Sequence, residues 1–311
     1  MYQYILRRLL LTVPVIIGVS VIVFSLIRLL PGDPARALAG VQATPEYIEQ
    51  VRERYGLNDP LYVQYGRFMA GLVTGDLGVS TFSRRPVTTE IGERFPRTLI
   101  LASISLVIAT VVGVSAGIVS ATRRNSIFDN ASMLVALVGV AAPVFWMALM
   151  LQLLFSVQLG WLPATGMGGV RHMVLPSITL GMASAALMAR ITRSSMLDVL
   201  RQDFITTARA KGLAERVVVY KHALKNALIP VVTVLGLQFG ILLGGAVLTE
   251  TVFAWPGVGR LLVDAILRRD YPVVQGTVML LALLFVVINL VVDVIYAYLD
   301  PRIHYQGQSN S

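Results

Sequence analysis

Residues 99–122 read LILASISLVIATVVGVSAGIVSAT, an uncharged run between Arg97 and Arg123. A helix of about 20 apolar residues crosses the hydrocarbon core of a bilayer, where only helices and closed barrels satisfy their own backbone hydrogen bonds. The run is unbroken and lacks the alternating polarity of barrel strands. It therefore predicts a transmembrane helix.

Five further apolar runs occur along the chain, over residues 9–27, 133–157, 173–189, 227–249 and 276–299. Hydrophobic residues make up 56% of the chain and charged residues 14%, whereas about a quarter of the residues of a soluble domain are charged. We therefore predict an all-α, polytopic membrane helical bundle with about six transmembrane helices.

The basic residues predict the orientation of this bundle. Arg7 and Arg8, then Arg123 and Arg124, then the basic segment 190–226 alternate along the chain with less basic connections. Because Lys and Arg mark the cytoplasmic ends of spans, we expect both termini in the cytoplasm (N-in and C-in). The net charge of +9 then needs no nucleic-acid partner to explain it.

The expected domains follow the spans. Residues 1–30 form the first transmembrane helix, and residues 31–97, with eight basic and eight acidic side chains, form an extracytoplasmic loop or cap. Residues 98–300 form the membrane core, which includes the cytoplasmic connection 190–226. Residues 301–311 form a polar C-terminal tail.

Motifs for catalysis and for cofactor binding are missing from the sequence. It has no Cys, and His172, His222 and His304 lie far apart, so we expect neither a metal site nor a catalytic residue. Without a G-x-x-x-x-G-K-[ST] motif, the chain is expected to bind no cofactor itself. The pattern Gly113-x-Ser-x-Gly117 lies inside an apolar run, so its glycines indicate close helix contact, within the chain or with another subunit.

The connection between residues 203 and 230 carries the most informative motif. Its residues are Thr206, Thr207, Ala208, Arg209, Ala210, Lys211, Gly212 and Leu213, followed by His222-Ala223-Leu224-Lys225-Asn226-Ala227. Such a segment predicts a short helix, a Gly at which the chain turns, and a second helix that re-enters the membrane.

This motif resembles the EAA loop in the permeases of ATP-binding-cassette (ABC) importers. Gly212 takes the position of the family's Gly, Ala208 that of its second Ala and Leu224 that of its Leu. Thr206 and Lys225 depart from the family's Glu and Pro. The resemblance implies a type I ABC importer permease fold, in which the residues from Thr206 to Leu213 form a coupling helix and turn that dock onto an ATPase subunit.

Further motifs are similar to the peptide and nickel branch of that family. They are Leu30-Pro31-Gly32-Asp33-Pro34, Tyr55-Gly56-Leu57-Asn58-Asp59-Pro60, Gly75-Asp76-Leu77-Gly78, Glu250-Thr251-Val252-Phe253-Ala254-Trp255-Pro256-Gly257-Val258-Gly259-Arg260, Arg269-Asp270-Tyr271-Pro272 and Asp300-Pro301-Arg302. By themselves these residues predict ordered turns. The resemblance implies import of small peptides (dipeptides, oligopeptides or glutathione), and nickel complexes remain open.

The resemblance also implies partners. A second, homologous permease would form the translocation pathway with this chain as a heterodimer. Two ABC ATPase subunits would bind ATP and Mg beneath the coupling loops, and an extracytoplasmic binding protein would deliver the substrate. The implied location is the bacterial cytoplasmic (inner) membrane.

Three polar residues are candidates for the translocation path: Gln238, Glu250 and Asp293. Gln238 can alternatively form a hydrogen bond between helices. An acid at the centre of a span costs about 2.5–3.5 kcal/mol, so Asp293 should have a partner, either a structural one or as part of a gate or proton relay. A proton relay would make the chain a self-sufficient secondary transporter, which is the alternative function.

Single cysteines test the predicted orientation, because the natural chain has none. We introduce Cys separately at Thr81, Ser126, Gly168, Ala214 and Gln308 and treat whole cells with an impermeant thiol reagent. The cysteines at Thr81 and Gly168 should be labelled, since both lie in predicted external connections, and the other three should not. Labelling at Ala214 from outside would contradict the orientation.

Overall fold

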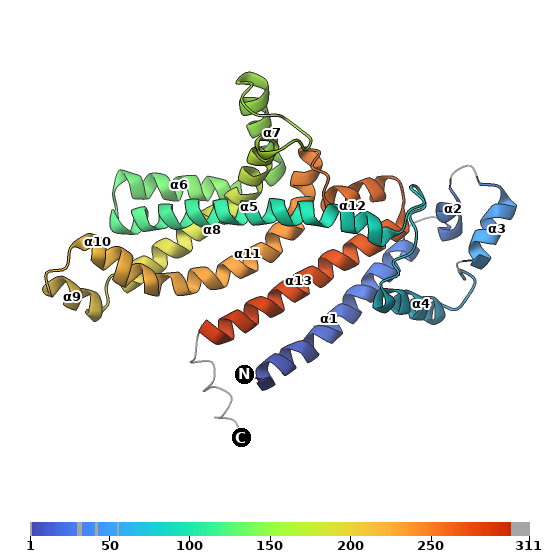
Figure 1. The fold of residues 1–311 in the computed structure, drawn as a ribbon, viewed down its shortest axis with the longest axis horizontal. Helices are drawn as coiled ribbons and strands as arrows, with labels where there is room; N and C mark the ends of the chain where they lie inside the picture. Colours follow the sequence, from blue (N-terminus) through green and yellow to red (C-terminus); the bar gives the residue numbers. More distant parts are fainter. Residues whose placement is uncertain (1, 30–32, 41–42, 55, 300–311) are drawn as a thin grey trace. The chain divides into compact units, whose positions relative to one another are not determined.

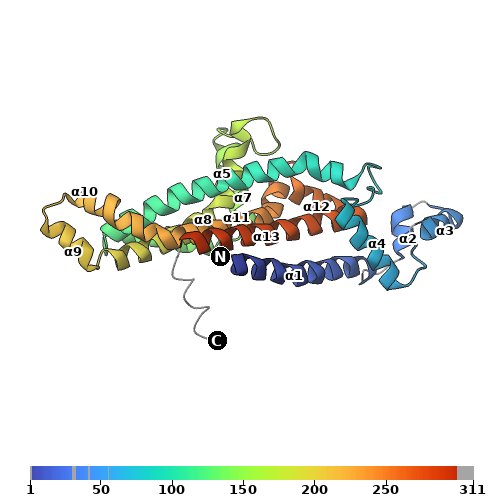
Figure 2. The same ribbon diagram turned by 60° about the horizontal axis from the view of Figure 1, so that its bottom comes forward.

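The computed structural model describes residues 2–29, 33–40, 43–54 and 56–299. These residues are almost entirely helical (Figures 1 and 2), and the only β-structure among them is an isolated antiparallel bridge between Val79 and Pro86. The predicted all-α class is confirmed.

The helices follow one another along the chain with short connections. In order they are α1 (Tyr2–Leu29), α2 (Pro34–Ala39), α3 (Pro45–Arg54), α4 (Leu61–Thr74), α5 (Val87–Thr122), α6 (Ile127–Ala141), α7 (Val144–Leu151), the π-helical turn η1 (Gln152–Gln158), α8 (Val170–Val199), α9 (Asp203–Ala210), α10 (Glu215–Val217), the π-helical turn η2 (Val218–Ala223), α11 (Leu224–Val252), α12 (Val258–Leu267) and α13 (Tyr271–Leu299).

Five helical stretches of the described residues are long and apolar enough to cross a membrane. They cover Arg8–Ser25, Val87–Thr122, Val170–Val199, Glu215–Val252 and Tyr271–Val292. A sixth span results if the bent pair of α6 with α7 and η1 counts as one. The prediction of about six transmembrane helices is therefore confirmed.

The bent pair lies in the predicted apolar run 133–157. Ile127–Ala141 and Val144–Gln158 meet at an angle of 109°. Ala142 between them is extended (φ −72°, ψ 129°), because the ring of Pro143 disfavours the helical conformation in the residue before it. Instead of one kinked helix, the run therefore forms two helices that point in different directions.

Residue contacts divide the chain into two compact units. The first comprises Met1–Thr98 and Pro256–Val287, and the second comprises Leu99–Trp255 and Ile288–Ser311. These units are defined by contacts and not by spans, so the domain boundaries predicted from the sequence stay a prediction.

In the second unit, glycines allow α5 to pack directly on α8. A Cβ atom added at Gly113 would lie 2.5 Å from the carbonyl oxygen of Ala185, and one at Gly117 would lie 2.7 Å from that of Ala189. No real Cβ approaches a backbone oxygen so closely. The two glycines of the predicted small-residue motif therefore serve a contact within the chain.

Helix α8 is the most buried helix of the second unit and contacts α6, α7 and α11 as well. Small side chains fill much of its buried surface, as expected where helices approach closely in a membrane. Apolar side chains of α5, α8 and α11, with Trp255 from the connection after α11, complete a core of Leu101, Ala102, Leu180, Leu242, Leu243, Ala246 and Trp255.

In the first unit, α1 packs on α4 through polar and aromatic contacts. The hydroxyl groups of Ser20 and Tyr65 lie 2.7 Å apart, and the ring of Phe24 meets that of Tyr65 edge to face at 5.3 Å. A second contact joins the beginnings of α5 and α13 to α12. Its buried residues are Val87, Ile91, Leu261, Ala265 and Val273.

A pair of glycine substitutions tests the contact between α5 and α8. Gly117→Ala should destabilise the protein by about 1–3 kcal/mol, because the new methyl group must displace backbone or side-chain atoms. Gly244→Ala is the matched control, since a Cβ at Gly244 meets nothing within 4 Å. Thermal unfolding in detergent should show a lower midpoint only for Gly117→Ala, and equal midpoints would contradict the packing.

Candidate coupling site

Helix α9 is short and has one buried face. Ile205 and Ala208, three residues apart, are 0% and 7% exposed, while Phe204, Thr207 and the other residues of the helix are exposed. Residues three apart share one face of a helix. Helix α9 therefore lies on the protein with a two-residue apolar face and presents a polar face outward.

The buried face of α9 belongs to an apolar cluster at one end of the second unit. We call this the α9 cluster; its buried members are Ile118, Ala121, Met196, Val199, Ile205, Ala208, Val218, Val219, Ala223 and Ala227. They come from α5, α8, α9, η2 and α11, and both Figures 1 and 2 show α9 and α10 at the ends of α8 and α11. Helix α9 is thus packed directly against three of the long helices.

The turn after α9 has the geometry of a Schellman motif. Gly212 has φ +76°, its N–H donates to the carbonyl oxygen of Arg209 at 2.9 Å, and the N–H of Leu213 donates to that of Ala208 at 3.4 Å. Only glycine adopts this left-handed conformation without strain, and the pattern ends a helix at once. The turn predicted at Gly212 is present.

An ion pair joins the two sides of this turn. The Arg209 guanidinium donates to both carboxylate oxygens of Glu215, at 2.6 and 3.1 Å. Both side chains are exposed, so the pair adds at most about 1 kcal/mol to stability. The hydrogen bonds from Arg209 to Glu215 raise the pKa of Arg209, whose charge is therefore retained.

The eight predicted coupling residues form one continuous element, the end of α9 and its turn. Seven of them are exposed, and only Ala208 is buried. The exposed ones include Arg209, which is paired with Glu215, and Lys211. Their contact with an ATPase subunit stays a prediction at this stage.

The candidate path residues on α11 are both buried. Gln238 is 6% exposed and donates to the hydroxyl oxygen of Ser184 on α8 at 2.9 Å. Glu250 is 0% exposed, and its carbonyl oxygen accepts a hydrogen bond from the N–H of Trp255 at 2.8 Å. The side chain of Asp293 lies outside the described residues.

Sequence reasoning missed a buried ion pair at the beginning of α6. Asp129 is 1% exposed, and the Arg193 guanidinium of α8 donates to its two oxygens at 2.7 and 2.8 Å. The hydroxyl of Ser120 and the N–H of Asn125 donate to the same carboxylate. The pair ties α5, α6 and α8 together at one end of the second unit.

Part of this arrangement has a sequence signal. Ser126 caps α6 by accepting a hydrogen bond from the N–H of Asp129, which is the spacing of a capping box. Ser-x-x-Asp therefore places a carboxylate at a helix start. It cannot indicate that the partner is Arg193, 64 residues away.

In the described part of the chain no three His, Asp or Glu side chains are grouped to hold a metal ion. The chemistry available at α9 and its turn is that of a protein contact, with an apolar inner face, a turn fixed by Gly212 and a polar outer face.

Comparison with known proteins places this geometry in a family. Residues 113–305 match the family described as "Binding-protein-dependent transport system inner membrane component", and residues 1–102 match its separate N-terminal family. The chain belongs to this family. It is thus a multi-pass inner membrane protein and the transport component of an ABC importer, a system that also includes ATPase and substrate-binding partners.

Two curated relatives cover almost the whole chain. The dipeptide transport system permease DppB of Alkalihalophilus pseudofirmus is 49% identical and the glutathione transport system permease GsiC of Escherichia coli K12 is 51% identical. Each alignment covers 98% of this chain and 100% of the relative.

Solved transporters share the fold at low sequence identity. A chain of the MetNI methionine ABC transporter superposes with a TM-score of 0.58 at 20% identity, covering 68% of this chain and 96% of that one. A chain of an amino acid ABC transporter gives 0.54 at 13% identity, with 68% and 94% covered. The expected ABC importer permease fold is confirmed. Because the family depends on a binding protein, the self-sufficient secondary transporter loses its support.

Removal of the Asp129 carboxylate tests the buried ion pair. Asp129→Ala leaves Arg193 without its partner and should cost about 3–5 kcal/mol of stability. Asp264→Ala is the matched control, because Asp264 is 40% exposed and lies 3.9 Å from Arg260, where a pair contributes about 0–1 kcal/mol. Thermal unfolding of the purified permease should separate the two variants clearly, and similar midpoints would contradict the role of the pair.

Proposed function

We propose that this chain is one of two unlike permease subunits of an ATP-driven importer for small peptides. The observation that supports this best is its sequence identity of 49% and 51% to a dipeptide and a glutathione permease over their full length. A pathway protein meets its cargo only briefly, so the proposal names dipeptides, oligopeptides and glutathione as one class.

The coupling element of this permease is α9 with its turn, from Thr206 to Leu213. Docking onto a groove of an ATPase subunit would use the exposed face, which carries Arg209, Ala210 and Lys211. Motion would enter the bundle through Ile205 and Ala208, which are packed in the α9 cluster. The Schellman turn supports the transfer because it keeps the outer face in a fixed relation to the buried one.

The remaining parts of the importer follow from this assignment. Two ATPase subunits bind ATP and Mg, so that the cofactor chemistry lies outside this chain. A second, homologous permease completes the pathway as a heterodimer, and an extracytoplasmic binding protein supplies the peptide. The chain itself forms no covalent bond with its cargo.

The polar positions of the path are Gln238, Glu250 and Asp293. Polar side chains inside a membrane bundle face its interior or a water-filled pathway. Gln238 and Glu250 are buried within the chain here, so exposing them to cargo requires a rearrangement of the bundle. Alternating access supplies such a rearrangement, and Ser184 would then lose its bond from Gln238.

Substitutions of Gly212 test the coupling proposal. Gly212→Val forces a β-branched residue into a left-handed conformation at a cost of about 1–2 kcal/mol or more, without any clash, because a Cβ there meets nothing within 4 Å. Gly212→Asn is the matched control, since Asn tolerates this conformation. In proteoliposomes with all subunits, Gly212→Val should assemble but lose most ATP-driven dipeptide uptake, and Gly212→Asn should retain it.

A cross-link tests directly whether α9 contacts the ATPase. A Cys at Ala210 should form a disulfide with a Cys in the groove of the ATPase, and its yield should change when nucleotide is added. Normal uptake by Gly212→Val, together with no cross-link from Ala210, would reduce the loop to an orientation signal. Absence of peptide uptake by the intact transporter would reject the substrate class.

A further inference from the structure

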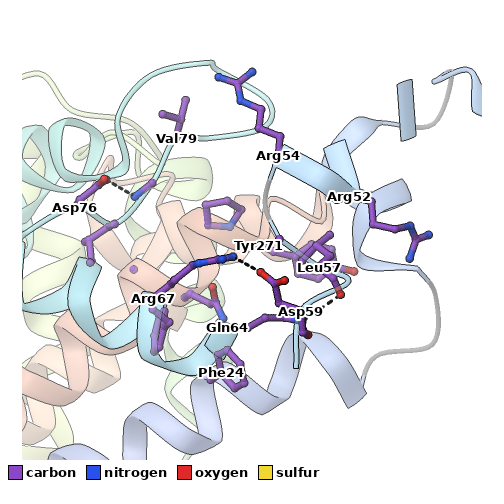
Figure 3. A pocket seen from close by; sticks show the side chains of 18 of the residues that line it. Phe24, Arg52, Arg54, Leu57, Asp59, Gln64, Arg67, Asp76, Val79 and Tyr271 are labelled. Carbon is purple, nitrogen blue, oxygen red and sulfur yellow. Dashed lines mark hydrogen bonds and ion pairs between the residues drawn. The ribbon is translucent and has the colours of Figure 1, made fainter. Parts of the chain in front are cut away.

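Four turn motifs that the coupling function does not use meet around one cavity in the first unit. Its lining includes one or more residues from each motif, namely Asp33, Gly56, Leu57, Asn58, Asp59, Asp76, Leu77, Gly78, Tyr271 and Pro272. The cavity has a volume of about 940 Å³ and lies between α3, α4 and the beginning of α13. Figure 3 shows side chains from these segments around it.

One wall is the turn between α3 and α4. Gly56 has φ +60°, and a Cβ there would lie 1.8 Å from the guanidinium of Arg67, so only glycine lets this side chain lie against the turn. Arg67 pairs with Asp59 at 2.7 Å, and the two point toward one another in the cavity (Figure 3). Beneath them, Gln64 donates to the carbonyl oxygens of Leu57 and Asp59 at 3.1 and 2.7 Å. The wall is thus held by side chains and not by the backbone alone.

The opposite wall is the turn after α4. Gly75 (φ +76°) ends that helix, the N–H of Asp76 donates to the carbonyl oxygen of Gly71 at 2.8 Å, and the Asp76 carboxylate accepts from the N–H of Gly78 at 2.9 Å. A Cβ at Gly71 would lie 2.6 Å from the carbonyl oxygen of Asp76, so the turn folds tightly onto α4.

Asp270 fixes the loop of residues 80–82 to the beginning of α13. It is 3% exposed and accepts hydrogen bonds from the hydroxyl of Ser80 at 2.5 Å and from the N–H groups of Thr81 and Phe82 at 3.1 and 3.3 Å. Tyr271 and the ring of its neighbour Pro272 are thereby placed at the cavity. Residues that are far apart in the sequence are held here by specific contacts.

The chemical character of the lining is mixed. Charged side chains of both signs are present, with Arg52, Arg54 and Arg67 against Asp33, Glu53, Asp59 and Asp76. Apolar side chains lie among them, including Leu57, Leu61, Phe68, Leu72, Leu77 and Val79. Pockets for small molecules combine apolar walls with a few polar groups and measure about 300–1,000 Å³. The cavity has the size and lining of such a pocket.

Two of these charges are available to a ligand. Arg52 pairs with Asp33 and Arg67 with Asp59. Among the described residues, Glu53 and Arg54 at the end of α3 have no ion-pair partner, and both are exposed. Arg54 lies above the cavity in Figure 3. A ligand with one carboxylate, one ammonium group and apolar side chains would satisfy this arrangement.

We propose that the cavity is an extracytoplasmic site on the permease itself for the zwitterionic peptide, with Arg54 at its carboxylate, Glu53 at its ammonium group and Leu61 and Phe68 against its side chains. This rests on the proposed function, which supplies the substrate class. The site holds the peptide outside the membrane core after the binding protein releases it. Opposite charges on one ligand match the mixed lining better than a lipid tail does, and a concave cavity suits a small molecule better than a protein surface.

A cavity-filling variant with a neighbouring control tests the site. Leu61 lines the cavity and is 61% exposed, so Leu61→Trp fills the cavity without disturbing a core. Tyr62→Trp is the control, because Tyr62 is 77% exposed and is not part of the lining. The assembled transporter in nanodiscs, without its binding protein, is titrated with labelled Ala-Phe. Leu61→Trp should weaken binding roughly tenfold or more, because the larger ring occupies the space that the peptide's side chain needs, and Tyr62→Trp should bind as the wild type does.

The ligand's charged groups give a second measurement that a structural role would not change. Wild-type transporter should bind Ala-Phe more tightly than its C-terminal amide, and Arg54→Gln should reduce this preference. Equal binding to Leu61→Trp and Tyr62→Trp would overturn the proposal. The proposal would also be overturned if Arg54→Gln left the preference for the free carboxylate intact. The same holds if Leu61→Trp weakened only the affinity for the binding protein.

Uptake separates this inference from the proposed function. Wild-type transporter reconstituted with its binding protein should import Ala-Phe. Uptake by the wild type with no peptide binding to the cavity would overturn the site alone. No uptake of Ala-Phe, of an oligopeptide or of glutathione would overturn the substrate class, and the site with it.

Discussion

The proposed mechanism depends on one apolar contact, the burial of Ile205 and Ala208 of α9 in the α9 cluster. An eight-residue helix is not stable alone in water, since helices shorter than about 12–15 residues are marginal. The cluster therefore both forms the helix and attaches it to α5, α8 and α11. A force applied to the exposed face moves the ends of those helices, because their side chains interdigitate with those of α9.

The same end of the second unit is rigid for two further reasons. The Asp129–Arg193 pair joins α6 to α8, and its buried carboxylate has four donors. Gly113 and Gly117 of α5 permit close contact with the backbone of α8 at Ala185 and Ala189. Helices in a membrane gain no hydrophobic stabilisation from one another, so their association depends on close packing and on satisfied polar groups. In the proposed mechanism, motion at α9 would reach the membrane interior as movement of whole helices.

Sequence reasoning predicted the features that depend on local chemistry. Apolar run length predicted the spans, and the position of Gly212 predicted a turn. Sequence reasoning could not distinguish a kink from a break at Pro143, because neighbouring helices can satisfy the freed backbone groups in either case. It also could not pair Asp129 with Arg193, or bring four turn motifs to one cavity. Those contacts link residues far apart in the chain, and no local pattern encodes them.

The claim that α9 moves as one body with the bundle can be tested by distances between spin labels. Cys residues at Ala210 on α9 and Ser194 on α8, both exposed, are labelled in a chain that has no other Cys. Pulsed electron paramagnetic resonance of the full transporter then compares the nucleotide-free and ATP-bound states. We predict that the distance from Ala210 to Ser194 stays the same while the distance from Ala210 to the equivalent helix of the second permease changes. A changed distance from Ala210 to Ser194, with α8 stationary relative to the second permease, would contradict rigid coupling through the α9 cluster.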